Sequence, residues 1–128
     1  MPAPVSAFSY AIVRVVPDIE RGEFVNAGVL LFARQHDFLA ARVTLDKDRL
    51  RALCPEADPG DIEAALRAFV RVADGDEGAG PMAALPKSER FGWLAAPSST
   101  VVQCSPTHTG LCSDPRQALD ELFADLVA

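Results

Sequence analysis

Two strand-like runs separated by a short polar segment dominate the beginning of this 128-residue chain. The first, Tyr10–Val16, is rich in β-branched and aromatic residues, and the second is Glu23–Phe32. The intervening Pro17–Gly22 starts with a proline, which cannot donate to a sheet, and ends with a glycine, which tolerates a positive φ. This arrangement predicts an antiparallel β-hairpin. The alternative is a helix over Val25–Phe32, which is short and has Gly28 in its middle.

Because side chains alternate between the faces of a strand, the hairpin predicts two different surfaces. Pairing from the ends of the turn sets Arg14 opposite Asn26 and Ile12 opposite Gly28. The second face carries Arg14 and Asn26 beside Tyr10, and we expect it to point away from the helices. A bulge at Gly28 would shift this register. The first face is wholly apolar and should lie against the helices; it consists of Ala11, Val13, Val15, Val25, Ala27, Val29 and Leu31.

Length and composition favour one globular domain over residues 1–128. Hydrophobic residues make up 49% of the chain and charged residues 23%, which is typical of a folded protein. The net charge of -6 argues against nucleic-acid binding, which relies on lysine and arginine contacts to phosphates. We find no signal peptide and no apolar run of about 18 residues, so no membrane span is expected. Together with an odd number of cysteines, this predicts a cytoplasmic protein.

Beyond the hairpin, the pattern changes from alternation to helical spacing. Phe38–Leu45 alternates and predicts a third strand. Aspartates that can cap a helix predict a short helix after Asp46 or Asp48 and a longer one over Asp58–Ala73. Near the C-terminus, Asp114–Gln117 has the capping-box arrangement and predicts a final helix docked on the sheet.

The remaining segments carry weaker signals. Thr100–Cys104 is strand-like and predicts a fourth strand, whereas Met82–Leu85 predicts one helical turn. The acidic, glycine-containing Asp74–Pro81 predicts a mobile loop, and Met1–Ala7 a frayed lead-in. Ser88–Leu94 is predicted to be extended or irregular, and Ser105–Ser113 to be a loop. The sequence therefore predicts an α+β fold: a single domain with an antiparallel sheet of about four strands and two or three helices packed on one face.

Two groups of polar residues offer candidate chemistry. Cys104, His108 and Cys112 are all residue types that bind zinc, but their spacing is unusual and a fourth ligand is missing nearby. The favoured interpretation is two small buried cysteines beside a loop histidine, and a zinc site is the alternative. The second group is Arg14 and Asn26, joined by Arg42 if the third strand keeps the same parity. An arginine fork with an amide beside it suits a carboxylate or phosphate, although these side chains also suit a plain solvent-facing sheet surface.

Two longer motifs carry a family resemblance: VVPDIERGEFVNAGVLLF (Val15–Phe32) and ERFGWLAAPSSTVVQCSPTHTGLC (Glu89–Cys112). With the closing DP…LDELF segment, the chain resembles the bacterial family "domain of unknown function 3037" over nearly its whole length. The family carries no established activity. The resemblance implies a partner role beside a HipA-like kinase. Its recurring pattern is matched at Glu20, Arg21, Gly22, Glu23, Asn26, Gly28, Glu89, Arg90, Phe91, Trp93, Ser99, Thr100, Gln103, Ser105, Pro106, His108, Thr109 and Gly110.

These observations favour a small cytoplasmic protein-binding or accessory module that uses no cofactor or metal. The alternative hypothesis is an enzyme acting on a phosphorylated or nucleotide-like substrate, with His108 as acid/base and Arg14 or Arg90 holding the anion. An enzyme should bring His108 and an arginine together in a concave pocket. The sequence does not indicate the oligomeric state. The candidate binding residues are Arg14, Arg21, Glu23, Asn26, Arg42, Arg90, Trp93, Thr100, Gln103 and His108.

Overall fold

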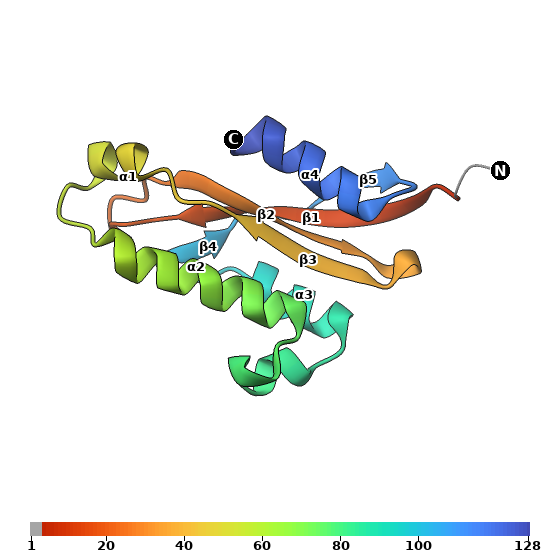
Figure 1. The fold of residues 1–128 in the computed structure, drawn as a ribbon. Helices are drawn as coiled ribbons and strands as arrows, with labels where there is room; N and C mark the ends of the chain where they lie inside the picture. The colour runs from red at the N-terminus through yellow and green to blue at the C-terminus, as the bar shows by residue number, and fades with distance from the viewer. Residues whose placement is uncertain (1–3) are drawn as a thin grey trace.

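The computed structural model describes residues 4–128 and shows an antiparallel sheet between two layers of helices (Figure 1). Three short 3-10 turns, at Arg34–His36, Glu77–Ala79 and Pro81–Ala84, join some of the elements. No helix in this described part of the chain is long and apolar enough to cross a membrane. The strands and α-helices, in chain order, are β1 (Ser6–Val15), β2 (Val25–Ala33), β3 (Phe38–Val43), α1 (Lys47–Leu53), α2 (Pro59–Asp74), α3 (Lys87–Ala95), β4 (Val102–Cys104), β5 (His108–Cys112) and α4 (Pro115–Leu126).

The predicted α+β class, single domain and antiparallel sheet are confirmed, with five strands and four α-helices among the described residues. The strand order is β3-β2-β1-β4, and β5 also pairs with β1. β4 and β5 therefore follow one another along the same side of β1. The predicted helical turn near Met82 is also present, as the 3-10 turn Pro81–Ala84.

A single interruption separates β4 from β5. Ser105 lies there with its side chain 2% exposed, and its Oγ accepts a hydrogen bond from the Ile12 N–H over 2.8 Å. The Ser105 N–H donates to the Ile12 carbonyl, also over 2.8 Å. Both backbone groups of Ile12 are thus satisfied where the ladder breaks. The predicted fourth strand is confirmed at Val102–Cys104, but the loop predicted over Ser105–Ser113 is wrong at β5, because the chain rejoins β1 after the serine.

The hairpin contains a β-bulge beside Gly28, and this bulge shifts the predicted pairing of β1 with β2. Arg14 pairs with Asn26 as predicted, but Gly28 pairs with Val13 rather than with Ile12. The extra residue, Ala27, changes the parity of β2. The bulge lies where β2 and β3 approach closely, since a Cβ on Gly28 would lie 2.5 Å from the Arg42 carbonyl oxygen. No side chain fits there without movement of β3.

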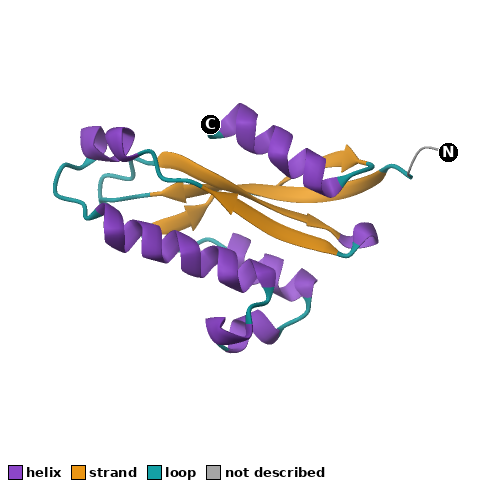
Figure 2. Cartoon of the chain, viewed as in Figure 1, coloured by secondary structure: helices purple, strands orange, loops and turns teal. Residues whose placement is uncertain are grey.

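Helices cover both faces of the sheet, not one face as predicted (Figure 2). Val13 and Leu30 pack in the core formed with α2, while Val29 packs in the core formed with α4. All three are fully buried. The odd-numbered residues of β1 lie against α2 as predicted, but the bulge sends Val29 and Leu31 to the other face. There they form an apolar surface that α4 covers, so the even-numbered face does not look away from the helices.

Aspartates begin three of the helices, as the sequence predicts. The Asp46 carboxylate accepts from the N–H groups of Asp48 and Arg49, both over 3.1 Å. Asp58 and Asp114 cap α2 and α4 in the same way. These local bonds satisfy N–H groups that the first turn of a helix leaves free.

The remaining predictions differ from the structure at segment ends and in α3. β1 begins at Ser6, so Ser6 and Ala7 are not part of a lead-in; the first three residues of that prediction lie outside the described residues. The extended conformation predicted for Ser88–Leu94 is wrong, because this segment lies in α3. Its helical pattern is weak, since it contains a glycine and an exposed Trp93 and has no side-chain cap. Phe91 supplies the tertiary contact, with its ring centroid 5.6 Å from that of Phe32.

Candidate functional site

Three predicted site residues form one row across the sheet. Arg14 of β1 lies between Asn26 of β2 and Gln103 of β4 in the pairing register. The Asn26 Nδ2 donates to the Leu126 carbonyl of α4 over 3.2 Å, and the Gln103 Nε2 donates to the Thr100 carbonyl over 2.7 Å. The two amides are therefore fixed by local contacts, and the arginine between them is the charged member of the row.

The Arg14 guanidinium lies over an aromatic ring. Its central carbon is 4.1 Å from the ring centroid of Phe24, a distance suited to a cation–π contact. The buried Arg14 Nε and the buried Asn26 Oδ1 have no hydrogen-bond partner among the described residues. Arg14 and Asn26, which pair across β1 and β2, thus each carry one buried polar atom without a hydrogen bond in the described part of the chain: a donor on Arg14 and an acceptor on Asn26. Phe24 is 44% exposed, so the aromatic ring that contacts the Arg14 guanidinium lies partly at the surface.

Arg42 is not part of this row. It lies on β3 opposite Val29, and its Nη1 is 3.0 Å from the Asp120 carboxylate of α4. Its guanidinium carbon is 4.2 Å from the ring centroid of Phe123. These contacts attach Arg42 to α4, so the predicted cluster of Arg14, Asn26 and Arg42 does not form one open surface.

Arg90 and Trp93 belong to α3, which lies on the opposite side of the sheet from α4 (Figure 1). The Arg90 Nη1 donates to the Leu85 carbonyl over 2.8 Å, and its Nη2 donates to the Ala73 carbonyl over 3.4 Å. Arg90 thereby links the C-terminal turn of α2 to the segment before α3, which is a structural contact. Trp93 is 63% exposed and lies away from the row around Arg14.

His108 lies on the same sheet face as Arg14 but beside the middle of β1. Its ring centroid is 5.3 Å from that of Tyr10, its partner in the register. Tyr10 precedes Arg14 by four residues, which corresponds to about 13 Å along a strand. Arg90 is on the other face. The structure therefore does not bring the proposed acid/base together with either arginine that was to hold the anion.

The two cysteines around His108 lie on opposite faces of the sheet. Cys104 packs against the core under α2, and Cys112 belongs to the core under α4. Burial raises the pKa of the Cys104 thiol to about 12 and also raises the pKa of the Cys112 thiol. Both remain protonated near neutral pH, and the sheet separates them, so this arrangement does not form one metal site with His108.

A pocket of about 500 Å³ lies between the β1–β2 turn and α1. It has a cationic rim, formed by Arg21 of the turn and Arg49 of α1, and an apolar wall that includes Phe24. It joins the row described above through Phe24 and Asn26. Its lining residues are Arg21, Glu23, Phe24, Val25, Asn26, Arg49, Ala52 and Leu53.

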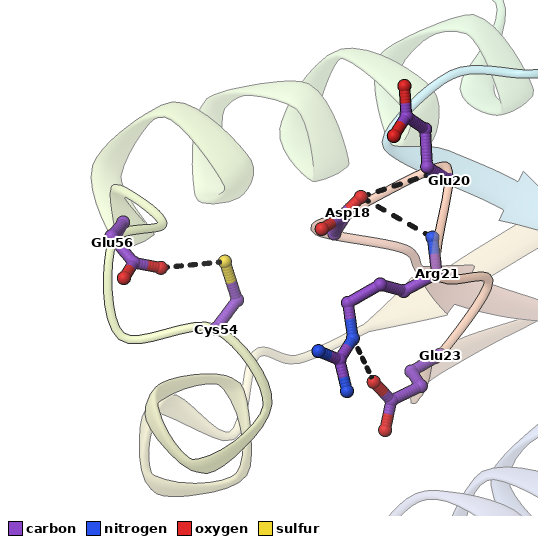
Figure 3. A network of polar contacts seen from close by, with 6 residues as sticks. All are labelled: Asp18, Glu20, Arg21, Glu23, Cys54 and Glu56. Carbon is purple, nitrogen blue, oxygen red and sulfur yellow. Dashed lines mark hydrogen bonds and ion pairs between the residues drawn. The ribbon is translucent and has the colours of Figure 1, made fainter.

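Local hydrogen bonds shape the turn beside this pocket (Figure 3). The Asp18 carboxylate accepts from the N–H groups of Glu20 and Arg21, over 3.1 and 3.4 Å. The Arg21 Nε donates to the Glu23 carboxylate over 2.6 Å, and this bond raises the pKa of the Arg21 guanidinium. Figure 3 shows the Arg21 side chain extending from the turn toward Cys54. The turn thus places the Arg21 guanidinium in the pocket between the hairpin and α1.

Arg49 is held in a similar way from the other side. Its Nε is 3.3 Å from the Asp46 carboxylate, which also caps α1. Sequence reasoning missed Arg49 and Phe24 as site residues. The Asp46 cap that positions Arg49 was predicted from the sequence. The approach of Arg49 to the hairpin was not, because it depends on the path of the chain between β3 and α1. Phe24 carried a visible signal, namely a large aromatic residue beside a charged turn.

The fold and the pocket define a small α+β domain with a cationic, partly apolar recess at one end of its sheet. The chain belongs to the family described as "Protein of unknown function (DUF3037)", whose model matches residues 10–127. This confirms the resemblance found in the sequence. No curated protein and no solved structure shows significant similarity to the chain.

Proposed function

We propose that this chain is a protein-binding accessory module whose pocket between the β1–β2 turn and α1 receives an acidic side chain of a partner protein. The observation that carries the proposal is that Arg21 and Arg49, from separate elements, line the same pocket. Guanidinium groups bind carboxylates and phosphates in a planar fork. A site that joins two such groups to an apolar wall suits an acidic residue flanked by an apolar one.

The ion pairs within the pocket support binding by orienting the arginines. Glu23 and Asp46 each contact the Nε atom of their arginine. The printed distances are 2.6 Å from Nε to the Glu23 carboxylate for Arg21 and 3.3 Å from Nε to the Asp46 carboxylate for Arg49, so each guanidinium is oriented by one carboxylate. Held by one carboxylate each, the two side chains lose less conformational freedom when a ligand binds. The neighbouring Phe24, which is 44% exposed, supplies apolar contact area at the rim.

Charge also favours a selective site. The whole chain carries a net charge of -6, so acidic partners are repelled from most of its surface. In this recess the charges of Arg21 and Arg49 are balanced by Glu23 and Asp46, so an acidic group meets two guanidinium donors without the net repulsion of the remaining surface. The cytoplasm as location and a HipA-like kinase as partner follow from the sequence and its family resemblance, and they belong to this proposal.

The experiment is a capture of partner proteins from the native host with the wild-type chain and two variants. Arg21→Ala/Arg49→Ala removes both pocket guanidinium groups. Arg51→Ala is the matched control, because Arg51 lies on the same helix, is 71% exposed and pairs with Asp48 rather than lining the pocket. Quantitative mass spectrometry should find the same partner with wild type and Arg51→Ala and a strong loss with the double variant.

A direct measurement with the captured protein completes the test. Titration of the purified partner should show at least tenfold weaker binding to the double variant than to Arg51→Ala, with a smaller difference at high salt because the ion pairs are screened. Equal binding by all three chains would show that the pocket is not the contact. Thermal unfolding of each variant verifies that the chains compared are folded.

A further inference from the structure

The outer edge of β5 is an unpaired strand. β5 pairs with β1 on one side, and no described strand pairs with its other side. Leu111 on β5 is 73% exposed, and Val5, just before β1, is 65% exposed. Natural edge strands are usually protected by charged residues, prolines or bulges. Here Ser105 and Pro106 interrupt the edge before β5, but the strand itself, His108–Cys112, contains no lysine, arginine, carboxylate or proline.

The alternation of backbone groups identifies which β5 residues face outward. Ile12 directs both its N–H and its carbonyl toward the β4–β5 side of β1. The even-numbered residues of β1 do the same, so the pairs Tyr10–His108 and Phe8–Gly110 are the hydrogen-bonded ones. Between them, Thr109 and Leu111 point their N–H and carbonyl groups away from β1. A further strand could therefore add to this edge by bonding to these two residues.

The edge is complementary to itself. If two copies of β5 run antiparallel about an axis at Gly110, Thr109 of each copy lies opposite Leu111 of the other. All four of these residues present outward groups, so the pairing forms hydrogen bonds in both directions. Each exposed Leu111 then lies beside the other copy's Thr109 on the same sheet face, which buries part of its apolar surface.

Other features of this end of the sheet leave room for a second copy. α4 packs mainly on β2 and β3, toward the middle of the sheet, and its first turns approach the end of β5, where Gln117 and Glu121 line a small pocket with Leu111. An acidic chain with a net charge of -6 repels its own copies over most of its surface, and the residues of β5 themselves add no carboxylate to that repulsion. A Cβ on Gly110 would lie 2.5 Å from the Cζ atom of Phe8, so the Phe8 ring lies directly beside this glycine.

We infer that two copies of this chain associate edge to edge through β5, forming one continuous sheet with a two-fold axis at Gly110. The pairing involves short strands and buries less surface than a permanent dimer needs, so the dimer is weak and depends on concentration. A second copy suits this edge because the two-fold arrangement sets the exposed Leu111 of each copy beside Thr109 of the other and places Gly110, which has no side chain, at the axis. This inference does not depend on the proposed function, because the pocket lies beside the turn at the other end of β1.

Sedimentation under reducing conditions tests the inference with three chains. Wild type should change from monomer to dimer as its concentration rises to about 500 µM, a range that corresponds to weak association. Leu111→Lys places a charge at the edge and should weaken the dimer at least tenfold, because two lysines approach one another across the axis. The control is Ile19→Lys, which puts the same charge on a 47% exposed apolar residue of the β1–β2 turn and should leave association unchanged.

Amide exchange measured by NMR locates the contact. In the dimer, the N–H groups of Thr109 and Leu111 should exchange more slowly than in dilute protein, whereas that of Gly110, already bonded to β1, should change little. A wild type that stays monomeric over the whole range overturns the inference. So does a dimer that Leu111→Lys does not weaken, or protection that appears at another strand, which includes capture of a different protein's strand at this edge.

Discussion

Replacing Gly28 with alanine tests the bulge that sets the parity of the central strand. A Cβ at this position would lie 2.5 Å from the Arg42 carbonyl oxygen and 2.7 Å from the Val43 Cγ1 atom. The carbonyl belongs to the backbone of β3, so it moves only if the whole β2–β3 ladder moves. Arg42 pairs with Val29 and Val43 pairs with Gly28 itself, which leaves no slack in this ladder.

The expected cost follows from overpacking. Forcing a methyl group into a well-packed interior costs about 1–3 kcal/mol, and the backbone neighbour places Gly28→Ala in the upper part of this range. For a domain of this size, each kcal/mol lowers Tm by about 4 °C, so we expect a decrease of about 8–12 °C. Thermal unfolding followed by circular dichroism measures this shift.

Gly92→Ala is the matched control. It adds the same methyl group at a helical position of α3, where a Cβ meets no atom within 4 Å. Alanine is favoured over glycine in a helix by about 0.5–1 kcal/mol, so this variant should raise Tm by about 2–4 °C. Changes of opposite sign from the same substitution support the geometry of the bulge. A Tm for Gly28→Ala within 1 °C of wild type would refute it.

Three further outcomes follow from the packing. Leu119→Asp, at a fully buried position of α4, should destabilise the domain by about 3 kcal/mol or more, whereas Leu122→Asp, at a half-buried position, should cost less. Urea unfolding measures both, and equal unfolding midpoints for the two variants would contradict the docking of α4. Asn26→Ala removes the bond to the Leu126 carbonyl and should cost about 1 kcal/mol, with faster amide exchange confined to the last turn of α4; exchange unchanged there would exclude a tethering role. Burial raises the Cys104 pKa from 9.0 to about 12, so above pH 9 the unfolded chain ionises this thiol before the folded chain does. The stability that the buried thiol provides is present below about pH 9 and is lost as the pH rises toward 12. Between about pH 9 and 11, wild type should therefore lose about 1 kcal/mol per pH unit more than Cys104→Ala, and parallel profiles would contradict this.

Local patterns in the sequence were sufficient for much of the fold. The hairpin, the pairing of Arg14 with Asn26 and the caps at Asp58 and Asp114 depend on residues near one another in the chain. Turn chemistry and capping act over a few residues, so they can be read without knowing the rest of the structure. The family resemblance likewise came from contiguous motifs and is confirmed over residues 10–127.

The candidate site was predicted less accurately than the fold, because the positions of its residues depend on contacts between elements that are distant in the sequence. Arg90 matches the family pattern, but its guanidinium bonds two main-chain carbonyls, which is visible only once α2 and α3 are packed. Arg42 has the predicted parity, yet α4 covers its face. The pocket needed Arg49 from α1 to approach Arg21 from the turn, and no spacing in the sequence joins these residues.

The sequence by itself determined the β1–β2 hairpin and the starts of α1, α2 and α4, because alternation, prolines, glycines and aspartate caps act locally. Tertiary structure decided which face each residue of β2 occupies, since one extra residue at Ala27 reverses the alternation beyond it. That reversal creates the second apolar face, and α4 docks there rather than beside α2. The close approach of β3 to Gly28 holds the bulge in place, and this approach is a property of the assembled sheet.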